Sequence, residues 1–285
     1  MLPCLLALLA LPPADLQELV EQKTLRELRR FEQTLDGVLG VAVIDLASGR
    51  SISLNGDAVF PQASVIKIPI LAELFRASQE GKLQLDQRVT LTKADIVGGS
   101  GRLQRRLPGE PVTLTLRELA AEMIEFSDNT ATNKLIAILG MDAVNANLAR
   151  LGLQRTRLAR IMLDSAAAAR DQENVSTPIE MARLLEMIYR RKLPGSGEMI
   201  GILQTVDAGF RSAAPAAIPV ASKPGALNGV RNEAGIIFLP RRPFALAVMS
   251  SFLGERVNPV PAVTRIVYDN WEKLDRSNRY GNRIH

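Results

Sequence analysis

Ser64 and Lys67 stand three residues apart near the start of the apolar segment PQASVIKIPILAELF, residues 61–75. If this segment is helical, the two side chains lie on one face, one turn apart. A serine becomes a nucleophile when a nearby base accepts its proton, and a buried lysine with a lowered pKa can be that base. Serine and lysine are also common enough to meet by chance beside a core helix. The rest of the chain must decide between these interpretations.

The counts of histidine and cysteine restrict the possible catalytic groups. The chain has one histidine, His285, at its last position, and one cysteine, Cys4, near its first. We therefore expect neither a Ser-His-Asp triad nor a metal site that contains histidine, and we expect no cofactor. A hydrolase of this composition must take its base from lysine, aspartate or glutamate.

Two later segments offer groups that could complete a site around the first pair. Lys223, in the segment SKPG, could lower the pKa of Lys67 through the repulsion between two positive charges. In the segment FSDNTATN, Ser127 could relay a proton to a leaving nitrogen, and Asn129 could hold a substrate carbonyl. Asp128 is interpreted as a buried carboxylate that ties this loop together, because buried polar groups are normally hydrogen-bonded.

The pattern of apolar residues predicts the elements that position these groups. Two capping boxes, Thr115-x-x-Glu118 and Thr177-x-x-Glu180, mark helix starts, and a long loop lies between residues 157 and 176. Helices are expected over residues 15–35, 62–79, 116–126, 134–140, 142–152, 179–192 and 259–274. Strands are expected within residues 37–60, as a pair around a turn, and at 218–225, 229–240 and 243–253.

Strands at both ends of the chain, with helices between them, predict an α/β fold of the α+β kind. The sheet domain would be discontinuous, built from residues 15–61 and 212–285, and a helical domain would span residues 62–211. Together they would form one catalytic unit. A cleft between the two layers is the natural place for a site.

The first fourteen residues, MLPCLLALLALPPA, form an apolar segment that is too short to cross a bilayer and resembles the core of a signal peptide. Cys4 is interpreted as part of this leader, not as a lipid anchor. We therefore expect export, to the periplasm or the medium.

The net charge of +5 comes partly from the tail KLDRSNRYGNRIH and from residues 101–110. Only 4% of residues are aromatic, and no recognition motif accompanies these basic segments. We therefore interpret them as solvated surface and expect no nucleic-acid partner.

Three motifs occur in the order SVIK (64–67), SDN (127–129) and KPG (223–225). This order resembles the Ser-x-x-Lys, Ser-Asp-Asn and Lys-[Thr/Ser]-Gly set of class A β-lactamases and penicillin-binding proteins. The segment SDNTATN continues the class A pattern through Asn133, a residue interpreted as bracing a loop, and STPIEMARLLEMI resembles the helix after the Ω-loop of that family. The resemblance spans about residues 20–275 and implies an αβα sandwich with a five-stranded antiparallel sheet and an all-helical domain.

The resemblance implies a role for each motif residue. Ser64 is the acylated nucleophile, while Lys67 and Ser127 move its proton and Asn129 binds the substrate amide. The helix start at Ser64 suits this role, because its free N–H and the helix dipole both favour an oxyanion.

The last strands are expected to supply the remaining binding groups. By the same resemblance, Lys223 adds positive charge and Ala226 offers the second N–H of the oxyanion hole. Arg231 either meets the substrate carboxylate or is a surface arginine.

The sequence departs from the family pattern at two places. The Ω-loop, residues 160–178, has no glutamate before Glu173, so the carboxylate that activates the deacylating water is missing. Asp164 is the nearest candidate for this base, although its side chain is one methylene shorter. Pro224 replaces the threonine or serine whose hydroxyl helps to bind the substrate carboxylate. The acylating residues are thus present, and we expect slow deacylation.

Three functions remain open at this stage. The leading one is an exported class A β-lactamase-like serine hydrolase, associated with antibiotic resistance, that forms an acyl-Ser64 intermediate with β-lactams. The alternative is a penicillin-binding D-Ala-D-Ala carboxypeptidase or transpeptidase acting on peptidoglycan, and the third is a non-catalytic β-lactam receptor. In each case we expect a monomer.

Overall fold

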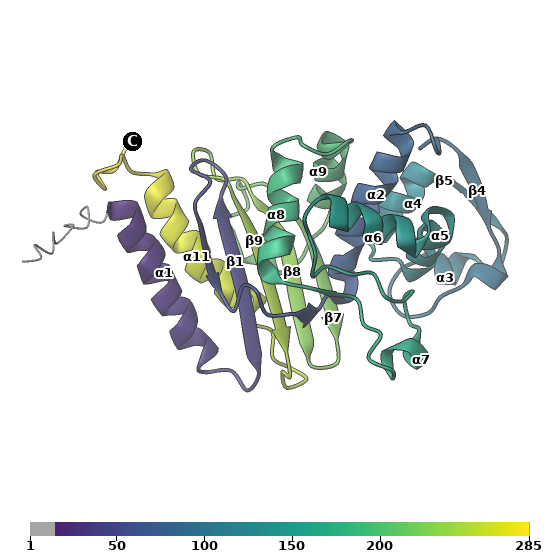
Figure 1. Ribbon diagram of the computed structural model, residues 1–285, viewed down its shortest axis with the longest axis horizontal. Helices are drawn as coiled ribbons and strands as arrows, with labels where there is room; N and C mark the ends of the chain where they lie inside the picture. The colour runs from purple at the N-terminus through teal and green to yellow at the C-terminus, as the bar shows by residue number, and fades with distance from the viewer. Residues whose placement is uncertain (1–14, 285) are drawn as a thin grey trace, which may run out of the picture.

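A five-stranded antiparallel sheet divides the molecule into two layers of helices (Figure 1). The computed structural model describes residues 15–284, so the predicted leader with Cys4, and His285, lie outside the described residues. The strand order is β2-β1-β9-β8-β7. The strands are β1 (Val38–Asp45), β2 (Ser51–Leu54), β7 (Val220–Leu227), β8 (Val230–Ile237) and β9 (Phe244–Ser251). The predicted fold class is confirmed.

The outer face of the sheet is covered by the first and last helices, α1 (Leu16–Glu32) and α11 (Val260–Asp275), which lie side by side (Figure 1). Alternate residues of β1, such as Val41 and Val43, enter this outer core because side chains of a strand alternate between its faces. Trp271 of α11 packs there against Phe244, with ring centroids 5.8 Å apart.

The inner face of the sheet is covered by α8 (Pro178–Tyr189), which lies on β1, β8 and β9, and by α9 (Ser196–Gln204), which lies on β7. Both helices come from the segment 62–211 that the sequence assigned to the helical domain. Segments of the predicted helical domain thus pack directly on the sheet. The proposed division into two domains stays a prediction.

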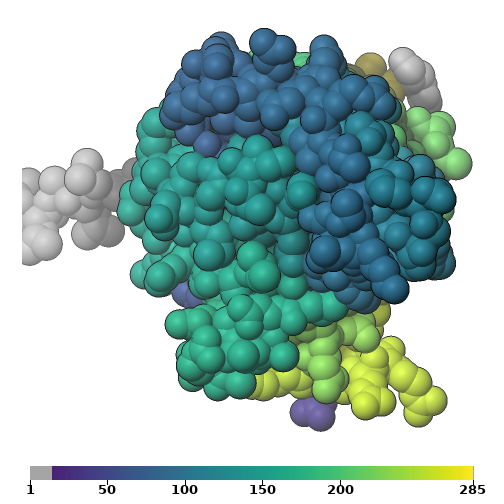
Figure 2. Space-filling model, turned by 90° about the vertical axis from the view of Figure 1, so that its right-hand side faces the viewer, coloured from purple at the N-terminus to yellow at the C-terminus, as the bar shows by residue number. Residues whose placement is uncertain are grey.

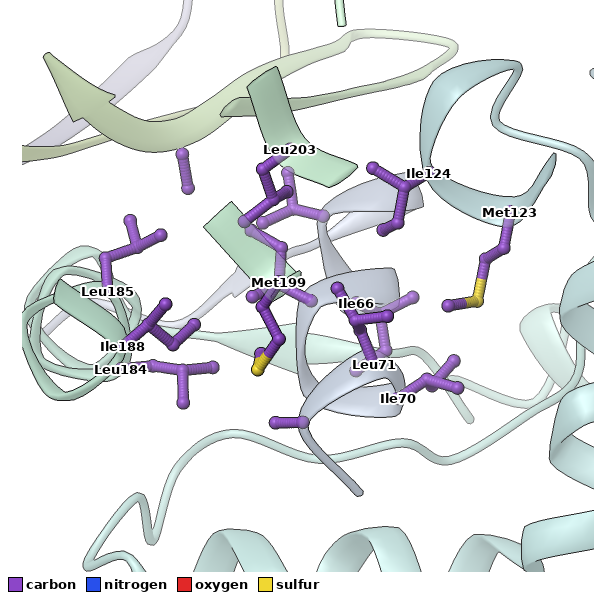
Figure 3. Packing of buried hydrophobic residues seen from close by; sticks show 14 of the residues in the cluster. Ile66, Ile70, Leu71, Met123, Ile124, Leu184, Leu185, Ile188, Met199 and Leu203 are labelled. Carbon is purple, nitrogen blue, oxygen red and sulfur yellow. The ribbon is translucent and has the colours of Figure 1, made fainter. Parts of the chain in front are cut away.

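The helical layer surrounds α2 (Lys67–Gln79), which follows the 3₁₀ turn η1 (Ala63–Ile66). Ile66, Ile70 and Leu71 of these two elements meet residues from α4, α8 and α9 in a buried apolar cluster (Figure 3). The remaining elements of this layer are η2 (Lys93–Asp95), α3 (Leu103–Arg106), α4 (Leu116–Glu125), α5 (Asn129–Leu139), α6 (Met141–Arg150), α7 (Ser165–Ala168) and the short strands β3 (Phe60–Pro61), β4 (Arg88–Leu91), β5 (Val112–Thr115) and β6 (Val175–Ser176). The short helix α10 (Gly209–Ala213) packs instead against α11, and its Phe210 is part of the outer core. Between residues 15 and 284, no helix combines the length and the apolar sequence needed to cross a membrane.

The single helix expected over residues 62–79 is in fact a 3₁₀ turn followed by an α-helix. Because α2 begins at Lys67, Pro69 falls in its first turn, where the N–H groups have no partner within the helix in any case. Pro69 therefore removes no hydrogen bond from the helix. Ser64 lies in the 3₁₀ turn, and Lys67 is the first residue of the α-helix.

One of the two predicted capping boxes is confirmed and the other is wrong. Thr115 and Glu118 form the reciprocal pair at the start of α4. Thr177 does accept a hydrogen bond from the Glu180 N–H. The Glu180 carboxylate, however, accepts hydrogen bonds from Arg155 N at 3.0 Å and from other groups of the preceding loop, because that loop folds back over the helix start.

Asp128 supports the helical layer from inside, as its sequence context predicts. It is buried, and its Oδ1 accepts a hydrogen bond from Ala131 N at the start of α5, while Oδ2 accepts one from Leu103 N, both at 2.9 Å. The carboxylate thus joins the start of α5 to the start of α3.

We predict that Asp128→Ala lowers the free energy of unfolding by about 2–4 kcal/mol, because it leaves two buried N–H groups without acceptors and removes a helix cap. Urea denaturation measures this change. Asp142→Ala, at an exposed position in the first turn of α6, should stay within about 0.5 kcal/mol of the parent. Equal stability of the two variants would contradict the structural role of Asp128.

Candidate active site

The edge strand β7 lies directly against the turn that carries Ser64. A Cβ atom at Gly225 would lie 2.7 Å from Gln62 O and 2.9 Å from Ser64 N, so only glycine allows this approach. The glycine of the KPG motif therefore brings Ala226 beside Ser64. Asn232 of β8 adds a tie, because its Nδ2 donates to Pro61 O at 2.7 Å.

Three residues around the site have left-handed backbone conformations that residues other than glycine rarely adopt. They are Ala63 (φ +50°), Ser127 (φ +51°) and Leu163 (φ +60°). Such conformations cost free energy and persist where the surrounding structure enforces them, often at functional sites. One precedes Ser64, one carries the hydroxyl next to Lys67, and one lies in the Ω-loop.

Lys67 is fully buried, with 0% of its side chain exposed. Its Nζ donates to Ser127 O at 2.8 Å, to Ser127 Oγ at 3.0 Å and to Asn129 Oδ1 at 3.0 Å. All three acceptors are neutral, and no carboxylate of residues 15–284 forms an ion pair with it. Burial and the nearby positive charge of Lys223 lower the pKa of Lys67 well below its usual value, although Asp128 opposes the shift.

Lys223 is the second buried cation and is 1% exposed. Its Nζ donates to Pro224 O at 3.2 Å. Burial lowers its pKa to about 7, against the opposing charge of Glu233. The structure thus brings Lys67 and Lys223 close enough to repel each other, as expected from the sequence.

Ser64 lines two adjoining cavities, and so does Ser100. Ala226 also lines both cavities. The N–H groups of these two residues are candidates for an oxyanion hole, since the first turn of a helix leaves its N–H groups unpaired and β7 is an edge strand. Asn129 lies beside them, held by its Nδ2 bond to Gly98 O at 3.0 Å.

The first cavity has a volume of about 310 Å³ and lies between Ser64 and the loop of residues 157–176. Asn133 fixes this loop, because its Nδ2 donates to Met162 O and its Oδ1 accepts from Met162 N. Asn145 holds Leu158 in the same way near the start of the loop. The clamp at Met162 makes Met162, 8% exposed, part of the cavity wall.

The loop reaches the facing segment through Leu163. An added methyl group at Gly99 would lie 3.2 Å from Leu163 Cδ1, which shows how closely the two segments approach. Figure 2 shows the helical end of the molecule, where the teal-green part of the chain with this loop adjoins the blue part before α5.

The two carboxylates that line the first cavity both bind other groups of the protein. Asp164 caps α7, and its Oδ1 accepts a hydrogen bond from Ala167 N at 2.8 Å. Glu173 forms an ion pair with Arg160 at 2.8 Å. Asp164 was the candidate deacylation base; it lines the same cavity as Ser64, but its carboxylate caps a helix, and its role as a base stays a prediction.

Arg231, the candidate for the substrate carboxylate, lines the second cavity. Its guanidinium donates to the carbonyl oxygens of Leu227, Val230 and Glu255 at 2.7, 2.8 and 3.0 Å. These bonds commit the guanidinium to bracing the turn between β7 and β8 and the segment after β9.

Sequence reasoning missed two residues that shape the site. Met162 was assigned no role, because its hydrogen bonds with Asn133 join residues that are far apart in the chain. Glu233, which lines the second cavity, was not considered. Its signal was a single acidic residue inside the apolar strand VRNEAGII.

Comparisons with known proteins agree with this geometry. Residues 22–271 match the Beta-lactamase enzyme family. Beta-lactamase CTX-M-97 of Escherichia coli is 31% identical over 237 residues, which cover 80% of this chain and 80% of that protein. A beta-lactamase from Chitinophaga pinensis superposes with a TM-score of 0.81 at 27% identity, covering 87% of this chain and 98% of that one. The L158E mutant of PBP-A, solved as an acyl-enzyme complex with penicillin G, superposes with a TM-score of 0.79 at 28% identity, covering 93% and 100%.

We predict that Asn133→Ala loosens the loop specifically at Met162, because both bonds of the amide clamp are lost. The amide of Met162 should exchange with deuterium at least about tenfold faster, as expected for the loss of two partly buried hydrogen bonds. Peptide-resolved hydrogen exchange measures this rate. The matched variant Asn145→Ala should accelerate exchange at Leu158 instead. Unchanged protection of Met162 in Asn133→Ala would show that the clamp does not hold the loop.

Proposed function

This chain belongs to the class A β-lactamase and penicillin-binding family of serine hydrolases that act on β-lactams, and we propose that it works through an acyl-Ser64 intermediate that is released slowly. The observation that carries this proposal is the buried Lys67 beside Ser127, together with Met162 in the wall of the first cavity, which Ser64 also lines.

Acylation requires that the proton of the Ser64 hydroxyl be taken up as its oxygen attacks the substrate carbonyl. Lys67 directly follows η1 and lies three residues after Ser64, at helical spacing. Its lowered pKa favours the neutral amine, which can accept a proton. The one lone pair of this amine takes the proton of Ser64 Oγ, and the ammonium that results donates a hydrogen bond to Ser127 Oγ over the 3.0 Å contact.

The same contact provides the route for the second proton transfer. When the scissile C–N bond breaks, the leaving nitrogen takes the hydroxyl proton of Ser127, which Lys67 replaces over the same contact. The N–H groups of Ser64 and Ala226 stabilise the negative charge on the carbonyl oxygen, and Asn129 holds the substrate amide. Lys223 strengthens this electrostatic environment in its protonated form.

Deacylation needs a base within hydrogen-bond reach of a water above the ester. Met162, in the wall of the first cavity, has a thioether side chain, which is not a base. The nearby carboxylates of Asp164 and Glu173 are occupied by a helix cap and an ion pair. These contacts support a long-lived acyl-enzyme.

The slow release also supports the second candidate function, a D-Ala-D-Ala carboxypeptidase or transpeptidase, and the similarity to PBP-A agrees with it. A non-catalytic β-lactam receptor would keep the same adduct without turnover. We further propose that the protein is exported to the periplasm or the medium, acts as a monomer, and contributes to antibiotic resistance if its turnover is sufficient.

The acylation step is tested by intact-mass measurement after incubation with excess penicillin G. We predict an adduct of one penicillin per chain, its absence in Ser64→Ala, and an acylation rate at least about a hundredfold lower in Lys67→Ala, which is the usual scale for loss of a general base. Ser78→Ala, near the other end of α2, is the matched control and should label like the parent. Labelling of Ser64→Ala would remove this serine from the mechanism.

The deacylation step is tested by adduct decay after excess penicillin is removed. Met162→Glu should speed decay by about a hundredfold, because it places a base in the cavity wall. Ile161→Glu should not, since Ile161 is 40% exposed and absent from that wall. Asp164→Asn should decay like the parent. The account of slow release fails if Asp164→Asn decays more slowly while Met162→Glu is unchanged.

A further inference from the structure

The two cavities that Ser64 lines would receive different parts of a substrate. Asn129, which would hold the substrate amide, lines only the first cavity, and Ser127, which would protonate the leaving nitrogen, lines only the second. A substrate bound over Ser64 therefore places its leaving group in the second cavity and the acyl group beyond its amide in the first. The residues that line the first cavity are then in a position to select this acyl group.

Leu163 is an unusual member of the wall of the first cavity. It is a large apolar residue, yet 56% of it is exposed. A single exposed leucine is common on protein surfaces. This one also has a left-handed backbone, with φ +60°, a conformation that is rare and costly for a residue with a branched side chain. An exposed apolar side chain is thus held in place by a strained backbone.

The residues on either side of Leu163 are both fixed. Met162 is clamped by the amide of Asn133, through one hydrogen bond in each direction. Asp164 caps α7, and the carbonyl oxygen of Leu163 accepts a hydrogen bond from Ser165 N at 2.9 Å. These contacts keep Leu163 in its strained conformation and present its side chain at the cavity.

Gly99 lies between Leu163 and the group that would bind the substrate amide. An added methyl group at Gly99 would lie 3.0 Å from Asn129 Nδ2 and 3.2 Å from Leu163 Cδ1. The two side chains are thus separated by the width of one glycine. An acyl group whose amide is bound by Asn129 would therefore extend over Gly99 toward Leu163.

The charged side chains of the same wall already have partners within the loop. Arg160 and Glu173 form an ion pair, and Asp164 caps α7. The amide of Asn174 is bound to the loop backbone in both directions, with Oδ1 accepting from Arg160 N at 3.0 Å and Nδ2 donating to Arg160 O at 3.1 Å. Beside these groups the wall has two further hydroxyls, those of Ser100 and Ser165. The surface that Leu163 offers next to Asn129 is therefore mainly apolar.

We propose that Leu163 is a specificity-determining residue that selects substrates whose acyl group carries an apolar arm beyond the amide. The inference rests on the proposed acyl-Ser64 function and specifies its substrate class on the acyl side. When such an arm covers Leu163, apolar surface of both partners leaves water, which stabilises the complex. A substrate without the arm leaves the leucine exposed and gains nothing from it.

The proposal is tested with two penicillins that differ only in this arm. Penicillin G carries a phenyl ring beyond its amide, and 6-acetamidopenicillanic acid has the same amide, ring system and carboxylate without the phenyl ring. Acylation breaks the lactam C–N bond and leaves the whole penicillin on Ser64, so intact mass measures its rate with either compound. The second-order rate constant for penicillin G should be about tenfold higher, the lower end of the range for an apolar contact in a substrate pocket. Equal constants, or faster acylation without the phenyl ring, would overturn the inference.

Variants assign the preference to this leucine. Leu163→Asn removes the apolar side chain, while asparagine adopts the left-handed backbone more readily than most residues. Its rate constant for penicillin G should fall to nearly that for the acetamido compound, which should stay unchanged. Leu163→Met keeps an apolar side chain and should keep the preference. The matched control Ile161→Asn should keep it too, because Ile161 is 40% exposed and absent from the wall.

A purely structural role of Leu163 gives a different result. An equal loss of rate for both penicillins in Leu163→Asn would show that the leucine only supports the loop, and would overturn the inference. If Leu163→Asn does not fold, Leu163→Gly decides by the same comparison, since glycine adopts the left-handed backbone without strain.

Failure of this inference is distinguishable from failure of the proposed function. If neither penicillin leaves an adduct on Ser64, the acyl-serine function is overturned, and this inference with it. If both penicillins acylate Ser64 at the same rate, only the selectivity is overturned.

Discussion

The buried side-chain amine of Lys67 is the constraint on which the rest of the site depends. The charged form of this lysine is strongly disfavoured, because its side chain is fully buried and has no carboxylate partner. The protein satisfies it with three neutral acceptors from the segment 127–129, and two of them come from the strained residue Ser127. The same contacts that make the burial tolerable place a hydroxyl next to the amine. The polar network is therefore both a structural requirement and a proton path.

The fold supplies this arrangement from three directions. The cluster around α2 fixes Lys67 from within the helical layer (Figure 3). Asp128 anchors the segment that bears Ser127, and β7 presses against the Ser64 turn through Gly225. Because Gly225 and Asn232 both contact the backbone around Ser64, the sheet and the helices meet at the nucleophile. On either side of it the two cavities differ in chemistry, with a thioether in one wall and a buried carboxyl in the other.

Much of this arrangement could be predicted from the sequence, because it depends on local patterns. Alternation and helical spacing predicted the sheet strands and the main helices, and the ordered motifs pointed to Ser64, Lys67, Ser127 and Lys223. What could not be predicted depends on long-range pairing. The Glu180 carboxylate binds the returning loop instead of its own helix start, and Arg231 turns back to carbonyls of its own hairpin. Neither contact follows from the local sequence, because each depends on how the loops fold.

The central claim, that burial makes Lys67 a base, is tested most directly by titrating the Nζ resonances of ¹⁵N-labelled lysines by NMR. Lys67→Arg and Lys223→Arg spectra assign the two buried signals. The account predicts that the Lys67 signal changes with a pKa well below the usual value of 10.5, and that this pKa rises when Lys223 is replaced by methionine. A Lys67 signal that titrates near or above 10.5 would contradict it.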